Sequence, residues 1–225
     1  VGSNNLSTAI ILLGICAFLI FISHPGYLPF LGIGGAGIGF IAVFLMMESY
    51  RLERLAIWRN PEAYEKGFQT IQGLYAIGSG RIFGCGLGKG LQKLGFVPEA
   101  QNDMIFAVIC EELGILGAFI MLGMFLYLIF QLFKIASRAE TIFGRAVVTG
   151  IAIHISLQVI VNIFVVLMIF PNTGVSLPFI SYGGSAVIFT MAEMGIALSV
   201  DREHFRAKVE RKAKQIIEEK ELPGY

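Results

Sequence analysis

The stretch that decides the fold is PEAQNDMIFAVICEELGILG, residues 98–117. It opens with polar residues that include Glu99 and Asp103, and it continues into a strongly apolar run that contains Glu111 and Glu112. Ionisable side chains at membrane depth are costly unless they face the interior of a helix bundle or a water-filled cavity. The four carboxylates therefore require a structural or a chemical explanation.

The composition of the whole chain indicates a polytopic membrane protein. Of its 225 residues, 56% are hydrophobic and 15% are charged, and the mean hydropathy is +0.74. Soluble domains carry about 25% charged residues. The formal net charge of +1 gives no indication of a nucleic-acid partner. The three cysteines, Cys16, Cys85 and Cys110, have neither disulfide nor metal-site spacing.

Five apolar segments are predicted to span the membrane as helices, so the predicted fold class is all-α. A bilayer core of about 30 Å requires about 20 apolar residues in a helix. A long polar loop is predicted at residues 48–103. The basic tail at residues 201–225 is predicted to be a solvated helix with a frayed end. The five predicted helices are residues 6–22, 27–47, 104–133, 146–170 and 187–200.

Basic residues in the short connections predict the orientation. The connection between the third and fourth segments is short and basic, and the tail carries six Lys or Arg residues between Arg202 and Lys214. Short basic connections stay in the cytoplasm. We therefore expect a cytoplasmic C-terminus, with the loop 48–103 and the turn at 171–186 on the outer face.

Asp103 lies at the predicted outer mouth of the third segment, near the start of the helix. An aspartate at this position can cap exposed N–H groups of the first helical turn. It can equally act as a general base on a substrate that binds at the mouth. The residues alone leave both alternatives open.

Glu111 and Glu112 are predicted to lie about 12 Å or more along the helix from Asp103, at about 1.5 Å per residue. They are rotated about 80° and about 180° from Asp103, so we expect the two carboxylates to face different neighbours. Either they pair with polar groups of adjacent helices or they line a substrate path.

A second polar pattern lies on the fourth segment, where His154, Gln158 and Asn162 recur every four residues and share one helix face. Hydrogen bonding between helices is the favoured interpretation of this stripe. A metal-ligand role for His154 is not favoured, because no His or Cys has the spacing of a partner ligand.

Two Gly-rich stretches complete the candidate site. The loop GSGRIFGCGLGKGLQK, residues 78–93, lacks a nucleotide-binding motif, but its basic residues could hold a phosphate of another ligand or could simply be solvated. The turn FPNTGVSLPFISYGGSA, residues 170–186, is predicted to fold into the mouth of the bundle, since irregular backbone beside a membrane needs protein or water around it.

Several long motifs resemble the SEDS family (shape, elongation, division and sporulation). PEAQNDMIFAVICEELGILG and PNTGVSLPFISYGGSA look like the two hallmark motifs of that family. GFQTIQGLYAIGSGRIFGCGLGKGLQK, residues 67–93, and NLSTAIILLGI also resemble it. The resemblance is closer to the division and sporulation type (FtsW-like) than to the elongation type (RodA-like). Members have ten spanning helices, so this chain is expected to be a second half that is inactive without the first.

The resemblance implies a peptidoglycan glycosyltransferase of the bacterial cytoplasmic membrane, which polymerises lipid II with a class B penicillin-binding protein and divisome-type partners. Asp103 matches the family's essential loop aspartate, which implies a catalytic role. The leaving pyrophosphate needs positive charge, and the resemblance leaves open whether a divalent cation (Mg²⁺ or Mn²⁺) assists. The expected substrate-binding residues are Arg81, Lys89, Lys93, Glu99, Gln101, Ser181 and Tyr182, and the expected polar cavity residues are Glu111, Glu112, Gln158 and Asn162.

Two departures and two alternatives remain at this point. Gln101 stands where the family often has His, and Arg81 stands where Gly is usual. One alternative is a transporter of lipid-linked precursors, which would use polar groups along a path through the membrane. The other is a non-catalytic scaffold that recruits a penicillin-binding protein.

Overall fold

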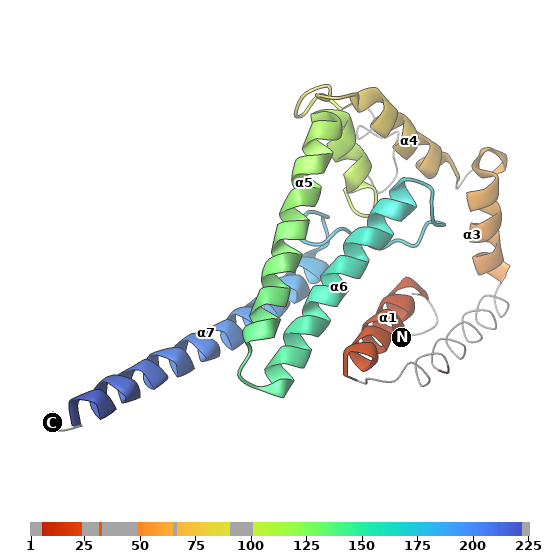
Figure 1. Ribbon diagram of the computed structural model, residues 1–225. Coiled ribbons are helices and arrows are strands. Elements are labelled where there is room, and N and C mark those ends of the chain that lie inside the picture. Colours follow the sequence, from red (N-terminus) through yellow and green to blue (C-terminus); the bar gives the residue numbers. More distant parts are fainter. Residues whose placement is uncertain (1–5, 24–31, 33–48, 65–66, 91–100, 222–225) are drawn as a thin grey trace.

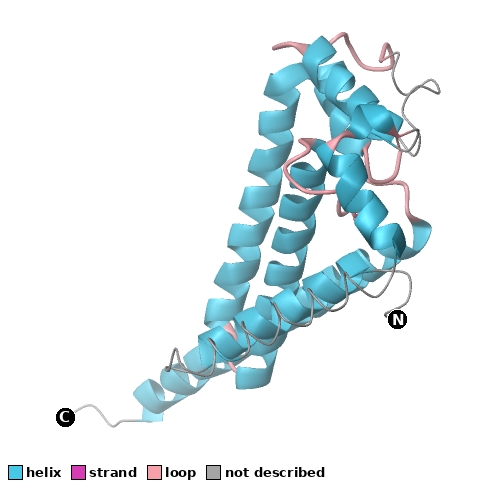
Figure 2. Cartoon of the chain, turned by 90° about the vertical axis from the view of Figure 1, so that its right-hand side faces the viewer, coloured by secondary structure: helices cyan, strands magenta, loops and turns pink. Residues whose placement is uncertain are grey.

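The computed structural model describes residues 6–23, 32, 49–64, 67–90 and 101–221. The described residues form helices and connecting turns, without a strand, which confirms the all-α fold class (Figures 1 and 2). The helices are α1 (Leu6–Ser23), α3 (Ser49–Arg59), the 3-10 helix η1 (Pro61–Ala63), α4 (Phe68–Gly80), α5 (Ile105–Arg138), α6 (Ile142–Val166) and α7 (Gly184–Glu221).

Three of the described helices are long and apolar enough to cross a membrane: α5, α6 and the part of α7 at Gly184–Ile217. A shorter apolar helix is present at Ile11–Phe21 within α1. Apart from residue 32, the predicted segment 27–47 lies outside the described residues. The core forms where α6 packs against α1, α5 and α7, and Val148, Ile155 and Val166 of α6 are almost fully buried.

The segment predicted as a polar loop, residues 48–103, contains three helical elements instead. Among them, α4 packs tightly against the first part of α5 because it presents small residues to it. A Cβ added at Gly80 would lie 1.8 Å from the carbonyl oxygen of Cys110, and one at Gly73 would lie 2.6 Å from Cε of Met104. Such short helices escape a search for spans of about 20 apolar residues.

A sharp bend divides α5 beside the end of α4 (Figure 1). The bend is at Gly114, whose φ of 68° and ψ of −170° are open to glycine but strained for other residues. The Gly-rich loop supplies the hydrogen bonds that the broken helix loses. The N–H groups of Cys85 and Gly86 donate to the carbonyls of Glu111 and Glu112 at 2.9 and 3.0 Å.

The same loop also accepts hydrogen bonds from the helix beyond the bend. The N–H of Ile115 donates to the carbonyl of Arg81 at 2.9 Å, and the N–H of Leu116 donates to that of Ile82 at 3.1 Å. The unpaired backbone groups created by the bend are thereby satisfied, as buried backbone groups must be.

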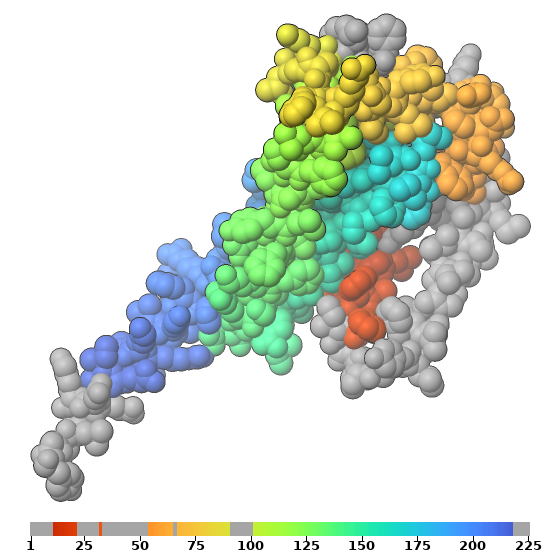
Figure 3. Space-filling model, turned by 45° about the horizontal axis from the view of Figure 1, so that its top comes forward, coloured from red at the N-terminus to blue at the C-terminus, as the bar shows by residue number. Residues whose placement is uncertain are grey.

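The last predicted span and the predicted tail form one continuous helix, α7, rather than a span followed by a separate segment. Its C-terminal part projects from the bundle as a single rod (Figure 3). Side chains favourable to helix, mainly Lys, Arg, Glu and Ala, fill residues 201–217 and allow the helix to continue in water.

Candidate functional site

The site forms where residues 101–103 contact residues 171–182, and we call this contact the motif junction. Asp103 lies in the turn just before α5 and is 9% exposed. The Nε2 of Gln69, carried by α4, donates to Oδ1 of Asp103 over 3.4 Å, which is a long and therefore weak hydrogen bond. The carboxyl group of Asp103 is thus near-buried between helix α4 and the start of α5.

Asn162 joins the two sides of the motif junction. Its side-chain Nδ2 donates to the backbone carbonyl of Asp103 and to that of Val175, each at 2.8 Å. The residue is 1% exposed. These two bonds fix the backbone of Asp103 relative to that of Val175. Replacing Asn162 would be costly, because it would leave two buried carbonyls without a donor.

Ser181 and Tyr182 tie the second motif to the residues before Asp103. The Ser181 hydroxyl donates to the carbonyl of Asn102 and accepts from the N–H of Leu177, each at 2.7 Å. The backbone N–H of Tyr182 donates to the carbonyl of Gln101 at 2.7 Å. The side chain of Tyr182 is 79% exposed and is free of the packing that holds Ser181.

The helix start lies one residue later than the capping alternative requires. The N-cap position of α5 is Met104, which makes no side-chain capping bond, and Asp103 precedes it. The carbonyl of Met104 instead accepts the first backbone hydrogen bond, from Ala107.

Glu111 and Glu112 do not face different neighbours, contrary to the expectation from an unbroken helix. Both are buried, and both approach Gly90 of the Gly-rich loop. A Cβ added at Gly90 would lie 2.8 Å from Oε2 of Glu111 and 3.0 Å from Oε1 of Glu112. The N–H of Gly88 donates to Oε2 of Glu112 at 3.1 Å. The loop folded over the bend meets both side chains, which sequence spacing could not predict.

The described basic candidates lie at the bend rather than beside Asp103. Arg81 and Lys89 are exposed and flank the loop that pairs with α5 at Gly114. That level is about 16 Å along α5 from Asp103, at about 1.5 Å per residue. Lys93 and Glu99 lie outside the described residues.

The polar stripe of α6 makes the interhelical hydrogen bond that it predicts. Nδ1 of His154 and Oε1 of Glu193, on α7, are 2.8 Å apart. Gln158, one turn further along, is half-buried. Glu193 was not singled out from the sequence, although it is the one acidic residue within the predicted span 187–200.

Gln69 and Asn172 are further site residues that the sequence did not single out. Nδ2 of Asn172 donates to Oε1 of Gln69 over 3.5 Å, and Gln69 in turn reaches Asp103. Two residues of α3 hold this region: Arg54 donates to the carbonyl of Asn172 at 3.0 Å, and Trp58 donates to that of Met168 at 2.8 Å. A polar residue of α4 and one in the turn after α6 give no sequence signal that they will meet.

Within the described part of the chain, no three His, Cys, Asp or Glu side chains gather in a way that could hold a metal ion.

Comparisons with known proteins agree on one family. The pattern of the FtsW/RodA/SpoVE family, described as cell cycle protein, matches residues 1–206. Stage V sporulation protein E of Bacillus subtilis is 38% identical over 200 residues, which cover 88% of this chain and 55% of that protein. The probable peptidoglycan glycosyltransferase FtsW of Trichlorobacter lovleyi is 37% identical over 198 residues, which cover 87% of this chain and 52% of that protein.

Solved structures show the same fold. A chain of a peptidoglycan synthase complex that coordinates polymerization and crosslinking matches with a TM-score of 0.67 and 27% identity, covering 89% of this chain and 56% of that one. The rod shape determining protein RodA of Thermus thermophilus matches with a TM-score of 0.58 and 26% identity, and the match covers 89% of this chain and 50% of that one. The chain spans about half the length of the curated relatives it matches.

Proposed function

The chain belongs to the FtsW/RodA/SpoVE family of cell cycle proteins, FtsW-like rather than RodA-like, and we propose that it supplies the catalytic half of a peptidoglycan glycosyltransferase that polymerises lipid II. Relatives named as peptidoglycan glycosyltransferases support this proposal. Because the chain spans about half of their length, the activity is proposed for the chain assembled with the remaining half.

One observation carries the proposal, which is the way the protein holds Asp103. Its backbone carbonyl is fixed by the amide of Asn162, and its carboxyl oxygen is within reach of Gln69. The residue directly before it is held by Ser181. These contacts fix the backbone that carries the carboxyl group, and such positioning supports acid–base chemistry at Asp103.

The proposed reaction is a glycosyl transfer in which Asp103 acts as the general base. The acceptor sugar hydroxyl attacks the anomeric carbon of the donor sugar, so a C–O bond forms there. The hydroxyl proton passes to the Asp103 carboxylate. The bond between the anomeric carbon and the lipid pyrophosphate breaks, and the pyrophosphate leaves with the electron pair. Arg81 and Lys89 remain candidates for binding phosphate, but at the bend rather than at Asp103.

The proposed location is the bacterial cytoplasmic membrane, with the motif junction outside and the C-terminus in the cytoplasm. The motif junction gathers residues 101–103 and 171–182, which the charge pattern assigns to one side. The basic connection between α5 and α6 contacts α7 beyond its apolar part, in agreement with a shared cytoplasmic side. The proposed partner is a class B penicillin-binding protein, supported by the match to a chain of a peptidoglycan synthase complex.

The test fuses the chain behind the part of Stage V sporulation protein E that it does not match, and incubates the purified fusion with labelled lipid II in detergent. We expect glycan strands from the unchanged fusion and a decrease of about 100-fold or more in rate for Asp103→Asn, since a general base contributes about 10²–10⁴-fold. Asp201→Asn, an exposed aspartate of α7, is the control and should retain the rate.

The outcomes separate the proposal from its alternatives. Equal rates for Asp103→Asn and the unchanged fusion would remove Asp103 from the mechanism. A folded fusion without polymer would instead favour a transporter or a scaffold, because transport across a bilayer plays no part in detergent. The chain without the missing half is expected to give no polymer.

A further inference from the structure

We propose that residues 201–217, the α7 extension, lie against the surface of the membrane and bind anionic phospholipid headgroups. The first reason is length. Residues 184–200 are mostly apolar, whereas the α7 extension is polar but continues the same helix. At about 1.5 Å per residue the α7 extension adds roughly 25 Å of helix beyond the apolar part. This inference is independent of the proposed catalytic function.

The second reason is an exposed apolar stripe on this otherwise polar helix. Phe205, Val209 and Ile216 are 66%, 52% and 54% exposed. At about 100° per residue they lie within about 40° of one another. A stripe of large apolar side chains on a polar helix is the pattern of a helix that lies in a membrane interface.

The third reason is the charge beside this stripe. Exposed Arg202 and Arg206 lie on one side of it, and exposed Lys208 and Lys212 lie on the other. Such long side chains bury their alkyl stems while their charged ends reach phosphate groups. Glu203 lies on the far side of the helix, about 160° from Phe205. Glu210 lies beyond Arg206, about 100° from Val209, and lines one surface hollow with Phe205, Arg206 and Val209. Within residues 201–217, Asp201 is the acidic residue nearest to the stripe by helical angle.

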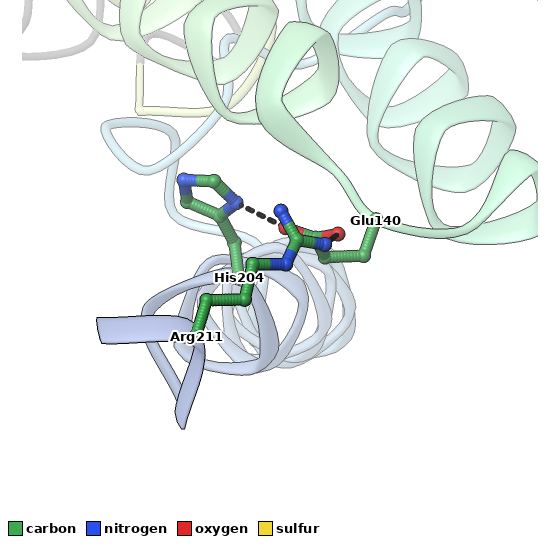
Figure 4. A network of polar contacts seen from close by, with 3 residues as sticks. All are labelled: Glu140, His204 and Arg211. Atoms are coloured by element: carbon green, nitrogen blue, oxygen red, sulfur yellow. Dashed lines mark hydrogen bonds and ion pairs between the residues drawn. The ribbon is translucent and has the colours of Figure 1, made fainter. Parts of the chain in front are cut away.

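A tether sets which face of the α7 extension is turned outward. Glu140, in the connection between α5 and α6, pairs with His204 at 2.9 Å and with Arg211 (Figure 4). At about 100° per residue, His204 and Arg211 lie more than about 100° from the stripe. The tether therefore holds the helix by a different face and leaves the stripe uncovered by the connection.

The direction of α7 agrees with a position along the membrane. In two views at right angles, α7 runs obliquely to α5 and leaves the bundle sideways (Figures 1 and 2). Its C-terminal part stands clear of the other helices (Figure 3). Because α7 is one continuous helix that runs obliquely to α5, the α7 extension leaves the bundle at a slant. It therefore lies closer to the lipid headgroups than a helix parallel to α5 would. The basic flanks select an anionic leaflet rather than a neutral one.

The test uses tryptophan as a depth probe in the full chain reconstituted into vesicles. Trp58 is the single tryptophan, so Trp58→Phe gives a dark background. Into it are placed Phe205→Trp, on the stripe, or Glu203→Trp, about 3 Å away along the axis and about 160° around it. The vesicles are phosphatidylcholine alone or mixed with phosphatidylglycerol, with or without brominated acyl chains that quench nearby indoles.

We expect the tryptophan at 205 to be quenched and blue-shifted in vesicles that contain phosphatidylglycerol, and the tryptophan at 203 to be neither. Equal behaviour of the two positions would overturn the proposal, and so would quenching at 205 that is the same without phosphatidylglycerol. If Trp58→Phe lowers stability, the measurement is repeated with Trp58 present and the parent spectrum subtracted.

A second pair of variants tests the basic flanks. Arg206→Gln with Lys212→Gln should abolish the dependence of quenching at 205 on phosphatidylglycerol. The control Lys214→Gln removes a charge on the opposite side of the helix and should leave that dependence intact. If Lys214→Gln removed the dependence on phosphatidylglycerol as fully as the double variant does, the position of the charge around the helix would not matter. The proposed orientation of the α7 extension would then be wrong.

Discussion

The buried amide of Asn162 connects the two motifs that the chain shares with its family, beside the direct bonds of Ser181 and Tyr182. Its two donated hydrogen bonds go to backbone carbonyls on different segments, Asp103 and Val175. Because Asn162 bonds to backbone carbonyls and not to side chains, it fixes the position of the Asp103 backbone relative to that of Val175.

Asn162→Ala should lower the free energy of unfolding by about 1–3 kcal/mol, since it leaves two buried carbonyls without their donor. In the fusion it should also reduce polymerisation, through displacement of Asp103. Gln158→Ala, on the same stripe but half-buried, is the matched control and should cost less. Circular dichroism during unfolding in mild detergent measures the stability of the two variants. Equal losses for the two variants would contradict the role given to Asn162.

Among the elements, α5 depends most on a loop that is distant in sequence. The bend at Gly114 exposes backbone groups of Glu111, Glu112, Ile115 and Leu116, and residues 81–86 bind all four. Helix and loop are therefore one structural unit. A change at the bend should affect both, whereas a change further along α5 should not.

Gly114→Ala should destabilise the protein by at least about 1–3 kcal/mol, the cost of holding a residue other than glycine in such a conformation. The added Cβ would also lie 2.4 Å from the N of Gly84 and from the carbonyl oxygen of Ile82. Gly123→Ala, in the same helix, meets nothing within 4 Å and should be neutral or slightly stabilising. The midpoints of thermal unfolding of the two variants are compared. Similar midpoints would contradict the conformation assigned to Gly114 at the bend.

In the whole molecule, one ion cluster connects the turn between α5 and α6 to the far part of α7. The hydrogen bond with His204, assisted by Arg211, lowers the pKa of Glu140 below the ordinary glutamate value. Because the folded-state pKa is the lower one, the stabilisation is fully present above the unfolded pKa of about 4.3 and is lost as the pH falls through the folded value.

Glu140→Gln should therefore lower the thermal midpoint at pH 6–7. The difference from the unchanged chain should shrink as the pH falls below the unfolded pKa of about 4.3, and it should disappear once the pH is below the folded-state pKa. Glu203→Gln, an exposed glutamate of α7, serves as the control and should show no such convergence. Scanning fluorimetry of the three proteins across this pH range is sufficient. A difference that persists unchanged at acidic pH would show that Glu140 acts by packing and not by its charge.

Composition and local pattern were enough for the membrane class, the all-α fold, the family and the polar stripe of α6. Hydropathy and motif order are properties of the chain itself, so they can be read without knowing which residues meet. The stripe at His154, Gln158 and Asn162 follows from helical periodicity alone. The helices within residues 48–103 were not recognised, because they depend on packing and helix propensity rather than on apolar length. The tail was predicted as a solvated helix, but its continuity with the last span in α7 was not predicted.

Contacts between distant segments required the folded chain. The partners of Asp103 come from α4 and α6, and Ser181, in the turn before α7, holds the preceding residue, Asn102. No periodicity connects Gln69, Asn162 and Ser181. Glu111 and Glu112 meet one loop because Gly114 bends the helix, and a bend satisfied by a separate segment leaves no local sign beyond the glycine. Local sequence specifies which helices form, whereas the close packing of small residues and the sharing of backbone hydrogen bonds specify which side chains come together.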